Sequence, residues 1–259
     1  MVRGIYTAGT GMLTQMNRMD VVANNIANSD TTGFKRDVAV TRSFTDRFMH
    51  ALGQPMAPLS FGDTRRIGQV RPGNFVDEVY TDFAGGAVRH TGNTFDMSIE
   101  GSGFFVVQAG EGEEAVVRYT RNGAFGLDSN RVLRTSEGHT VLSSAGAAIT
   151  VPEGVSIDIG YGGEIIVGGE VVANVGLVSF ENPQSLRKFG ENLFDRTEAT
   201  QEQGFVGRVL GGYLENSNVN TVREMVDMIN IQRNFEANQR MVTIQDNTLN
   251  LAVNEIARR

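Results

Sequence analysis

The sequence predicts an α+β fold in which a long helix at each end of the chain encloses a central antiparallel β domain. Apolar residues recur every seven positions in both terminal segments, whereas the centre shows the apolar–polar alternation of half-buried strands. The 31 glycines crowd the middle of the chain, and none follows Gly212. With 30 acidic and 23 basic side chains in 259 residues, the composition is that of a globular protein and not of a disordered chain.

The first helix is predicted by an apolar stripe at seven-residue spacing, formed by Ile5, Met12, Met19 and Ile26. Its first turns contain Gly4, Gly9 and Gly11, and each glycine costs about 0.5–1 kcal/mol relative to alanine in a helix. An isolated helix with these glycines is marginal, so it needs a partner. We expect it to end near Asn28, because residues 29–33 offer side-chain caps and then a glycine that tolerates positive φ.

The middle of the chain predicts two regions. Three prolines and several glycines in residues 37–80 indicate an extended arm, with a short helix around residues 44–52. A meandering antiparallel domain should follow, because Val155, Ile157 and Ile159 alternate with polar residues and glycine-bearing turns separate short β-rich segments. Further strands are expected over residues 104–108, 116–120, 132–135, 164–167 and 175–180.

The last segment is predicted to be one long helix. Thr221 and Glu224 have the spacing of a capping box, and no Gly or Pro occurs from there to the C-terminus. At about 1.5 Å per residue this helix would be roughly 55 Å long. Asn238 and Gln245 lie beside its apolar seam, where a tight two-stranded coil would have leucine, so it suits a crowded bundle with several neighbours. The seam itself consists of Met228, Phe235, Val242, Leu249 and Ile256.

These elements divide the chain into four predicted parts. They are the N-terminal helix with its exit turn (1–36), the arm (37–80), the β-rich domain (81–203) and the C-terminal helix (204–259).

Candidate chemistry is scarce. The absence of cysteine excludes disulfides and thiolate chemistry, and none of His50, His90 and His139 has a second histidine at metal-ligand spacing. No grouping of nucleophile, base and orienting residue is visible, so we expect a protein that is not an enzyme and has no metal or cofactor. The acidic balance argues against nucleic-acid binding. The sequence has no run of about 18 apolar residues, so we expect no direct membrane insertion. We also expect no cleavable secretory signal.

Two stretches resemble the signatures of bacterial flagellar rod and hook proteins. Residues 24–36, NNIANSDTTGFKR, are similar to the family's N-terminal signature. Residues 212–240 begin GYLENSNV, continue with EMVDMI and QRNFE, and are similar to the C-terminal one. EGSGFFVV at 100–107 and YTRNG at 119–123 fit the same family in the same order. One departure is Asn130, where the family often has a turn glycine, although asparagine also tolerates the left-handed conformation.

The resemblance implies a non-enzymatic building block of the flagellar axis, exported through the flagellar type III apparatus and located in the basal body within the cell envelope. Its terminal helices would form a coaxial, coiled-coil pair around the export channel, with the β domain further out. Its partners would be copies of itself and other axial proteins of rod and hook, with the export apparatus and the basal-body rings as further candidates. Residues 91–96 and 149–154 favour the proximal rod, whereas the long arm and residues 215–219 also suit the distal rod.

The same resemblance assigns two sets of site residues. An assembly interface would comprise both seams: Ile5, Met12, Met19, Ile26, Met228, Phe235, Val242, Leu249 and Ile256. Junction residues would shape the turn after the first helix and the approach to the last: Asn24, Asn25, Asn28, Gly33, Phe34, Glu215, Ser217 and Asn218. The alternative is a secreted carbohydrate-binding module or surface enzyme whose terminal helices pack on each other in a stable monomer.

Overall fold

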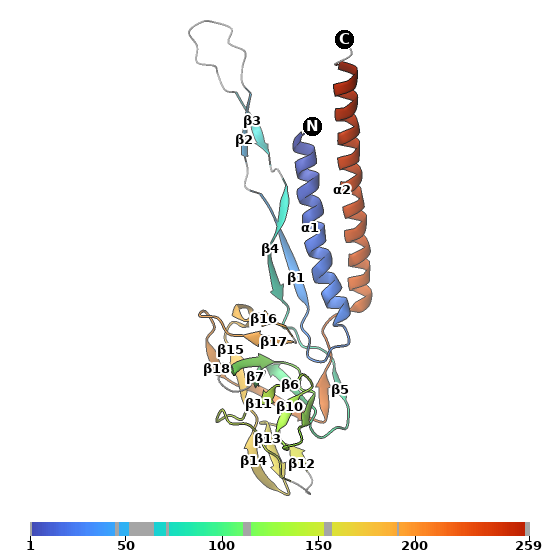
Figure 1. Cartoon of the computed structure of the whole chain (residues 1–259). Coiled ribbons are helices and arrows are strands. Elements are labelled where there is room, and N and C mark those ends of the chain that lie inside the picture. The colour runs from blue at the N-terminus through green and yellow to red at the C-terminus, as the bar shows by residue number, and fades with distance from the viewer. Residues whose placement is uncertain are drawn as a thin grey trace. The chain divides into compact units, whose positions relative to one another are not determined.

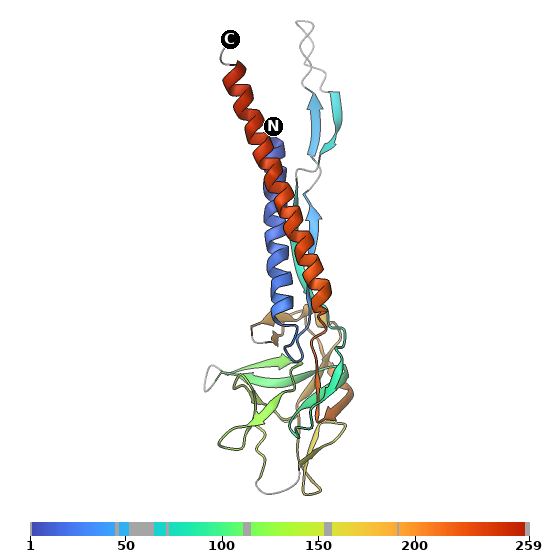
Figure 2. The ribbon, with the colours of Figure 1, turned by 90° about the vertical axis from the view of Figure 1, so that its right-hand side faces the viewer.

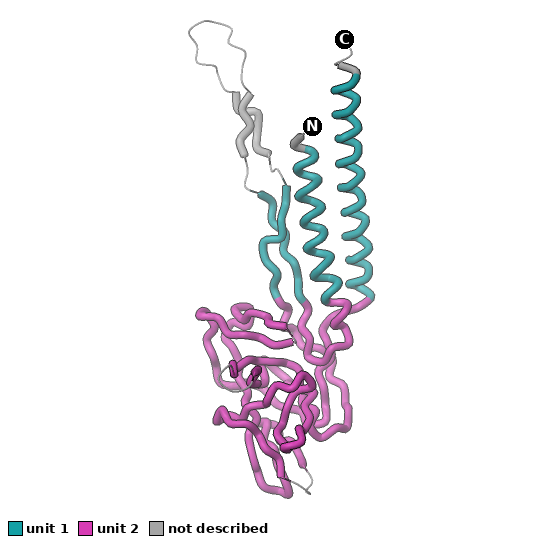
Figure 3. Tube along the Cα trace, in the orientation of Figure 1, with its two compact units in different colours: residues 1–24, 37–80, 222–259 teal, residues 25–36, 81–221 magenta. Residues whose placement is uncertain are grey.

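The structure is a computed structural model that describes residues 2–44, 47–51, 65–70, 73–110, 115–152, 157–190 and 192–256. The chain forms two compact units (Figure 3). The first contains residues 1–24, 37–80 and 222–259, and the second contains residues 25–36 and 81–221. The prediction of an α+β fold with a helix at each end and a central antiparallel β region is confirmed.

The first unit is built on two antiparallel helices, α1 (Val2–Ala27) and α2 (Thr221–Ile256), which lie side by side (Figures 1 and 2). α2 has 36 residues and begins at the threonine of the predicted capping box. α1 contacts α2 at two of its glycines, so α2 is the partner that the glycine-rich first helix needs. None of the described helices combines the length and apolar character that crossing a membrane requires.

A long β arm completes this unit. β1 (Asp37–Ser43) pairs with β4 (Asn74–Thr81), and β2 (Arg47–Ala51) pairs antiparallel with β3 (Arg65–Val70). The arm is joined to α1 by Thr14, whose Oγ1 donates to the carbonyl of Asn74 at 3.0 Å. The expected short helix around residues 44–52 is wrong, because the backbone of β2 forms its hydrogen bonds with β3 instead of within a helical turn.

The second unit consists of one large antiparallel sheet and smaller ones. Its main sheet has nine strands in the order β16-β17-β8-β7-β11-β10-β9, with β15 beside β7 and β18 beside β15. The bounds are β7 Phe104–Ala109, β8 Val116–Thr120, β9 Phe125–Leu127, β10 Leu133–Thr135, β11 Thr140–Val141, β15 Leu177–Phe180, β16 Arg187–Phe189, β17 Leu193–Asp195 and β18 Glu202–Gly204. A short 3-10 helix, η2 (Pro183–Ser185), precedes β16.

Three smaller sheets accompany it. β5 (Val88–His90) pairs with β20 (Tyr213–Glu215), and β6 (Met97–Ser102) pairs with β19 (Val206–Gly211). The third consists of β12 (Ile157–Ile159), β13 (Glu164–Val167) and β14 (Glu170–Asn174).

The predicted strands agree with β7, β8, β10, β12, β13 and β15 to within two residues. Val155 lies outside the described residues. The left-handed turn position expected at Asn130 is occupied by Arg131, with φ +58. The guanidinium of Arg131 donates to the carbonyls of Val151 and Pro152, both at 2.6 Å, and these bonds stabilise a conformation that arginine rarely adopts.

The core lies on both faces of β7, because consecutive side chains of a strand point to opposite sides. Phe105 and Val107 join the larger apolar cluster with Met97, Leu133 and other buried residues of the surrounding strands. Phe104 points the other way, into an aromatic cluster with Tyr119, Phe180 and Phe194. β7 therefore holds the centre of the unit.

Candidate functional site

The second unit contains a buried ion pair between Lys35 and Glu215. Nζ of Lys35 lies 2.6 Å from Oε1 of Glu215 and donates a second hydrogen bond to the carbonyl of Ala84 at 2.9 Å. The side chain of Lys35 is fully buried, and that of Glu215 is 3% exposed. A charge buried to this degree is strongly unfavourable unless it is paired and hydrogen-bonded, so each residue depends on the other.

Glu215 also collects contacts from other segments. Its Oε1 accepts the N–H of Gly86 at 2.8 Å, and its Oε2 lies 3.5 Å from Nη1 of the buried Arg121. The main-chain carbonyl of Glu215 accepts the N–H of Gly33 at 2.8 Å. Arg121 is further held by the carbonyl of Gly101, to which its Nη2 donates at 2.7 Å. We call Gly33, Lys35, Gly86, Arg121, Glu215 and Asn218 the junction.

Gly33 fits the junction for two reasons. Its φ of +66 lies in the left-handed region, which favours glycine. A Cβ on Gly33 would also lie 2.5 Å from the main-chain carbon and oxygen of Arg121. The close approach of these two backbones is what places the exit turn beside Arg121.

Asn218 binds the end of the exit turn at Arg36. Its Oδ1 accepts the N–H of Arg36 at 2.8 Å, and its Nδ2 donates to the carbonyls of Asp82 at 2.8 Å and Ala84 at 3.1 Å. Asp82 in turn donates its N–H to the carbonyl of Arg36 at 2.8 Å. An amide side chain has both a donor and an acceptor, so Asn218 links two main-chain segments at once.

The electrostatics of the junction follow from two cations sharing one carboxylate. The pKa of Lys35 is lowered mainly because burial penalises its charged form, while attraction and hydrogen bonding to Glu215 oppose this shift. The pKa of Arg121 is also lowered by burial, and Glu215 again opposes it. Removal of the carboxylate would therefore leave two buried charges without their counterion.

The structure brings four of the predicted junction residues together: Gly33, Phe34, Glu215 and Asn218. Phe34 is buried, and the ammonium of Lys188 lies 3.9 Å from the centroid of its ring. Among the other four, Asn24 is exposed and Asn25 is buried near the end of α1. Asn28 accepts a local hydrogen bond from Thr31 at 3.1 Å, and Oγ of Ser217 accepts the N–H of Val219 at 3.3 Å.

Sequence reasoning missed the cations of this site. Lys35 and Arg121 were parts of recognised motifs, but nothing in a local pattern distinguishes a buried cation from a solvated one. The lysines offered one signal: the chain has two, Lys35 and Lys188, and both lie here, since Nζ of Lys188 donates to the carbonyl of Lys35 at 3.0 Å. The exit turn is also tied by Asn192 and Asn122, which bond the carbonyl and the hydroxyl of Thr32 at 2.9 Å and 2.6 Å.

The two predicted seams are half-buried on their helices. Ile231, on the same face of α2, is fully buried. A different face of α2 stays open to solvent and carries large apolar side chains that are 48–72% exposed: Val222, Val226, Ile229, Ile244 and Leu251. The side chain of Ile256 lies outside the described part of the structure. The half-buried seam residues are Ile5, Met12, Met19, Ile26, Met228, Phe235, Val242 and Leu249.

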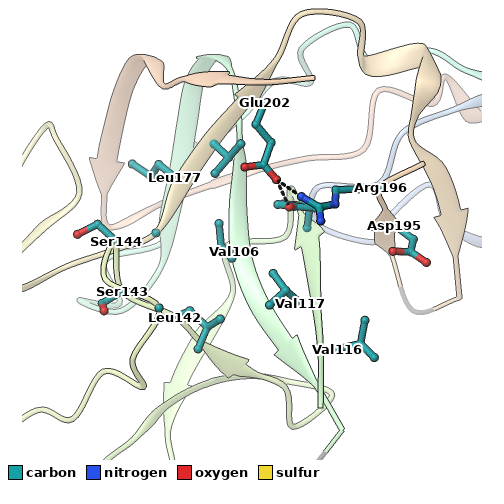
Figure 4. A pocket seen from close by; sticks show the side chains of 14 residues that line it. Val106, Val116, Val117, Leu142, Ser143, Ser144, Leu177, Asp195, Arg196 and Glu202 are labelled. Carbon is teal, nitrogen blue, oxygen red and sulfur yellow. Dashed lines mark hydrogen bonds and ion pairs between the residues drawn. The ribbon is translucent and has the colours of Figure 1, made fainter. Parts of the chain in front are cut away.

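A surface hollow of about 550 Å³ lies on the main sheet and is lined mostly by valines and small residues (Figure 4). One of its two carboxylates, Glu202, accepts hydrogen bonds from the hydroxyl of Tyr119 at 2.7 Å and from Arg196 at 3.2 Å. Burial and the neighbouring carboxylate raise the pKa of Tyr119, so its hydroxyl stays protonated. These polar groups satisfy one another. Among the described residues, no three acidic or histidine side chains gather as metal ligands would.

Comparisons with known proteins agree with the two ends and the centre of the fold. A family model described as Flagella basal body rod protein matches residues 5–35. Flagellar hook protein FlgE/F/G D1 domain matches residues 98–167, and Flagellar basal body rod FlgEFG protein C-terminal matches residues 210–255. The matched segments include most of α1, many of the central strands and nearly all of α2.

Curated relatives are similar along almost the whole chain. Identity is 34% to the flagellar basal-body rod protein FlgG of Borreliella burgdorferi, over 98% of both chains. It is 30% to FlgG of Bacillus subtilis, over 98% of this chain and 99% of the relative. It is 33% to the rod protein FlgF of Caulobacter vibrioides, over 100% of this chain and 98% of the relative. The chain belongs to the flagellar basal-body rod protein family.

Proposed function

We propose that the chain is a rod subunit that polymerises through its terminal helices into the helical drive shaft that transmits torque to the hook. As a family member it is a structural protein of the flagellar basal body and not an enzyme, and it assembles with other axial proteins. The alternative of a carbohydrate-binding module or surface enzyme is therefore abandoned. In the polymer, the helices of each copy would form a coaxial pair within an inner layer.

The observation that carries this proposal is the apolar face of α2 that the helix pair leaves in solvent. Val222, Ile244 and Leu251 are 72%, 58% and 61% exposed, although burial of these apolar side chains would be favourable. Removal of apolar surface from water would stabilise a contact between copies by about 25 cal/mol per Å². Large exposed apolar surface is typical of protein–protein contacts. A heterologous contact that does not close into a ring generates a helical filament.

The two faces of α2 then have different tasks. Residues of the predicted seam, such as Phe235 and Val242, are half-buried within a single copy. We infer that they hold the helix pair together, and that the exposed face contacts neighbouring copies. This division refines the predicted assembly interface, in which the seam alone was expected to meet other subunits.

The junction supports the same function from the second unit. It holds residues 33–36, which follow α1, against residues 215–218, which precede α2. Hydrogen bonds and a buried ion pair fix the distance between these two segments. The chain would therefore leave α1 and enter α2 in the same way in every copy.

We place the chain in the proximal rod, with the distal rod as the alternative. The support is the pair of segments at 91–96 and 149–154. Further proposed partners are the rings of the basal body and the export apparatus, through which the chain would leave the cytoplasm.

The test uses a strain of the source bacterium that lacks the gene. The tagged full chain should restore swimming and be recovered in isolated basal bodies, whereas a chain lacking residues 240–259 should do neither. Amide exchange over residues 81–203 of the truncated protein should match that of the full chain, which shows that its β domain is folded. Normal swimming with the truncated chain would contradict the proposal. Absence of the other rod proteins from basal bodies of the deletion strain would support the proximal position. Assembly of other rod proteins without the hook would support the distal position.

A further inference from the structure

The contact between α1 and α2 contains two glycine–amide pairs. A Cβ on Gly4 would collide with Nε2 of Gln245, and a Cβ on Gly11 would lie 2.9 Å from Nδ2 of Asn238. The two amide groups therefore occupy the space that a side chain on α1 would fill. Both glycines are unfavourable in a helix, and both amides are polar where a seam favours leucine, so each residue is anomalous alone. Together they are complementary.

The spacing of the pairs allows both of them to form in one register only. Gly4 and Gly11 are seven residues apart, as are Asn238 and Gln245, and the helices are antiparallel, so both pairs form at once. A slip of one heptad that brings Gln245 to Gly11 puts Asn238 opposite Arg18. Slips of half a heptad put Asn238 opposite Ala8 or Gln15, each of which has a Cβ where the amide needs space.

A third glycine shows that the effect is positional. Gly9 lies in the same helix, yet no atom outside its own turn lies within 4 Å of the place where its Cβ would be. Gly4 and Gly11 are on the face that meets α2, and Gly9 is not. Substitution of Gly9 is therefore the control for substitution of Gly4 or Gly11.

We propose that Gly4, Gly11, Asn238 and Gln245 are specificity-determining residues that fix the register of α1 on α2 of the same copy. A buried polar residue in a helix seam selects register and partner at the expense of stability. Here the amides, as they lie, leave no room for a Cβ at either matching position, so they favour a helix with glycine at both positions over other helices with similar apolar seams. This inference goes beyond polymerisation, because it concerns pairing within one copy.

The test is rescue by a second substitution. Four full-length variants are compared with the unsubstituted chain: Gly9→Ala, Gly11→Ala, Asn238→Ala and the double variant Gly11→Ala with Asn238→Ala. We expect Gly9→Ala to slow amide exchange in α1, because alanine favours a helix. Gly11→Ala should instead accelerate exchange in both helices several-fold, and the double variant should exchange at the rate of Asn238→Ala.

A Gly11→Ala chain that exchanges like Gly9→Ala would overturn the proposal, as would a double variant no better than Gly11→Ala. Equal, unprotected exchange of both helices in the unsubstituted chain would also overturn it. The same variants tested for swimming should rank in the same order. If the unsubstituted chain fails to restore swimming, the rod function fails, while the exchange rates still decide whether the pairs set the register.

Discussion

The ammonium of Lys35 lies 2.6 Å from the carboxylate of Glu215, although 180 positions separate these residues in the chain. Arg121 contacts the same carboxylate from a third distant segment. One carboxylate thus serves two buried cations, and the segment after α1 is held beside the segment before α2 by charge as well as by main-chain hydrogen bonds. Such a cluster is sensitive to loss of its anion, because the cations cannot return to water without unfolding the surrounding turns.

Substitution of Glu215 by Gln should destabilise the second unit by about 3–5 kcal/mol, the range found when one partner of a buried pair is removed. Gln keeps the size and one hydrogen-bond acceptor but leaves Lys35 and Arg121 without a counterion. Urea unfolding followed by a probe of the β domain measures the loss. Glu100→Gln is the matched control, because Glu100 pairs with Arg208 at an exposed position and should change stability little. Equal effects of the two substitutions would contradict the role given to the junction.

The lowered pKa of Lys35 predicts a pH dependence of stability. Because the folded state binds this proton more weakly than the unfolded chain, the unfolded chain holds more protons between the lowered pKa and the ordinary lysine value of about 10.4. In that window, raising the pH favours the folded state, with a slope of at most about 1.4 kcal/mol per pH unit.

The measurement compares the free energy of unfolding of the unsubstituted chain with that of Lys35→Met, which has no titrating group there. The unsubstituted chain should gain stability relative to the variant as the pH rises from neutral to the ordinary lysine value of about 10.4. A difference that stays flat or falls over this range would show that attraction to Glu215 outweighs the burial of the ammonium.

Gly33→Ala should lower the free energy of unfolding by more than the same substitution at another left-handed glycine. The left-handed conformation alone costs an alanine about 1–2 kcal/mol. Gly33 adds a collision with the main chain of Arg121, whereas Gly146, at φ +79, has no atom within 4 Å of the place that a Cβ would take. Chemical unfolding of Gly33→Ala and Gly146→Ala gives the comparison, and a loss for Gly33→Ala no larger than for Gly146→Ala would mean that the exit turn shifts freely.

The helices and most strands could be predicted because their signals are local. The seven-residue stripes of α1 and α2 and the alternation near Ile157 depend on neighbours a few positions away. The arm was harder: a strand at Arg47–Ala51 depends on its partner β3, which lies outside its own local sequence, so the expected short helix around residues 44–52 was wrong.

The site divides in the same way. Gly33, Phe34, Glu215 and Asn218 were found through the resemblance, but Arg121 was not, because it lies 94 positions from Glu215 and only the fold brings them together. Both anomalies of the helix pair, the glycines and the amides, were visible in the sequence. Their complementarity was not, since an apolar stripe on each of two helices does not specify which residue of one faces which residue of the other.

The last prediction separates the two faces of α2. Ile244 is 58% exposed, so Ile244→Asp should leave the stability of the free chain within about 0.5 kcal/mol of the original. In a polymer it would bury a carboxylate in an apolar contact, which is strongly unfavourable, so the variant should be absent from isolated basal bodies and its strain should not swim. Val242→Asp, two residues away on the half-buried seam, should instead accelerate amide exchange in α1 and α2 of the free chain. If Ile244→Asp assembles normally, the exposed face of α2 is not the contact between copies, and the seam or the β domain must supply it.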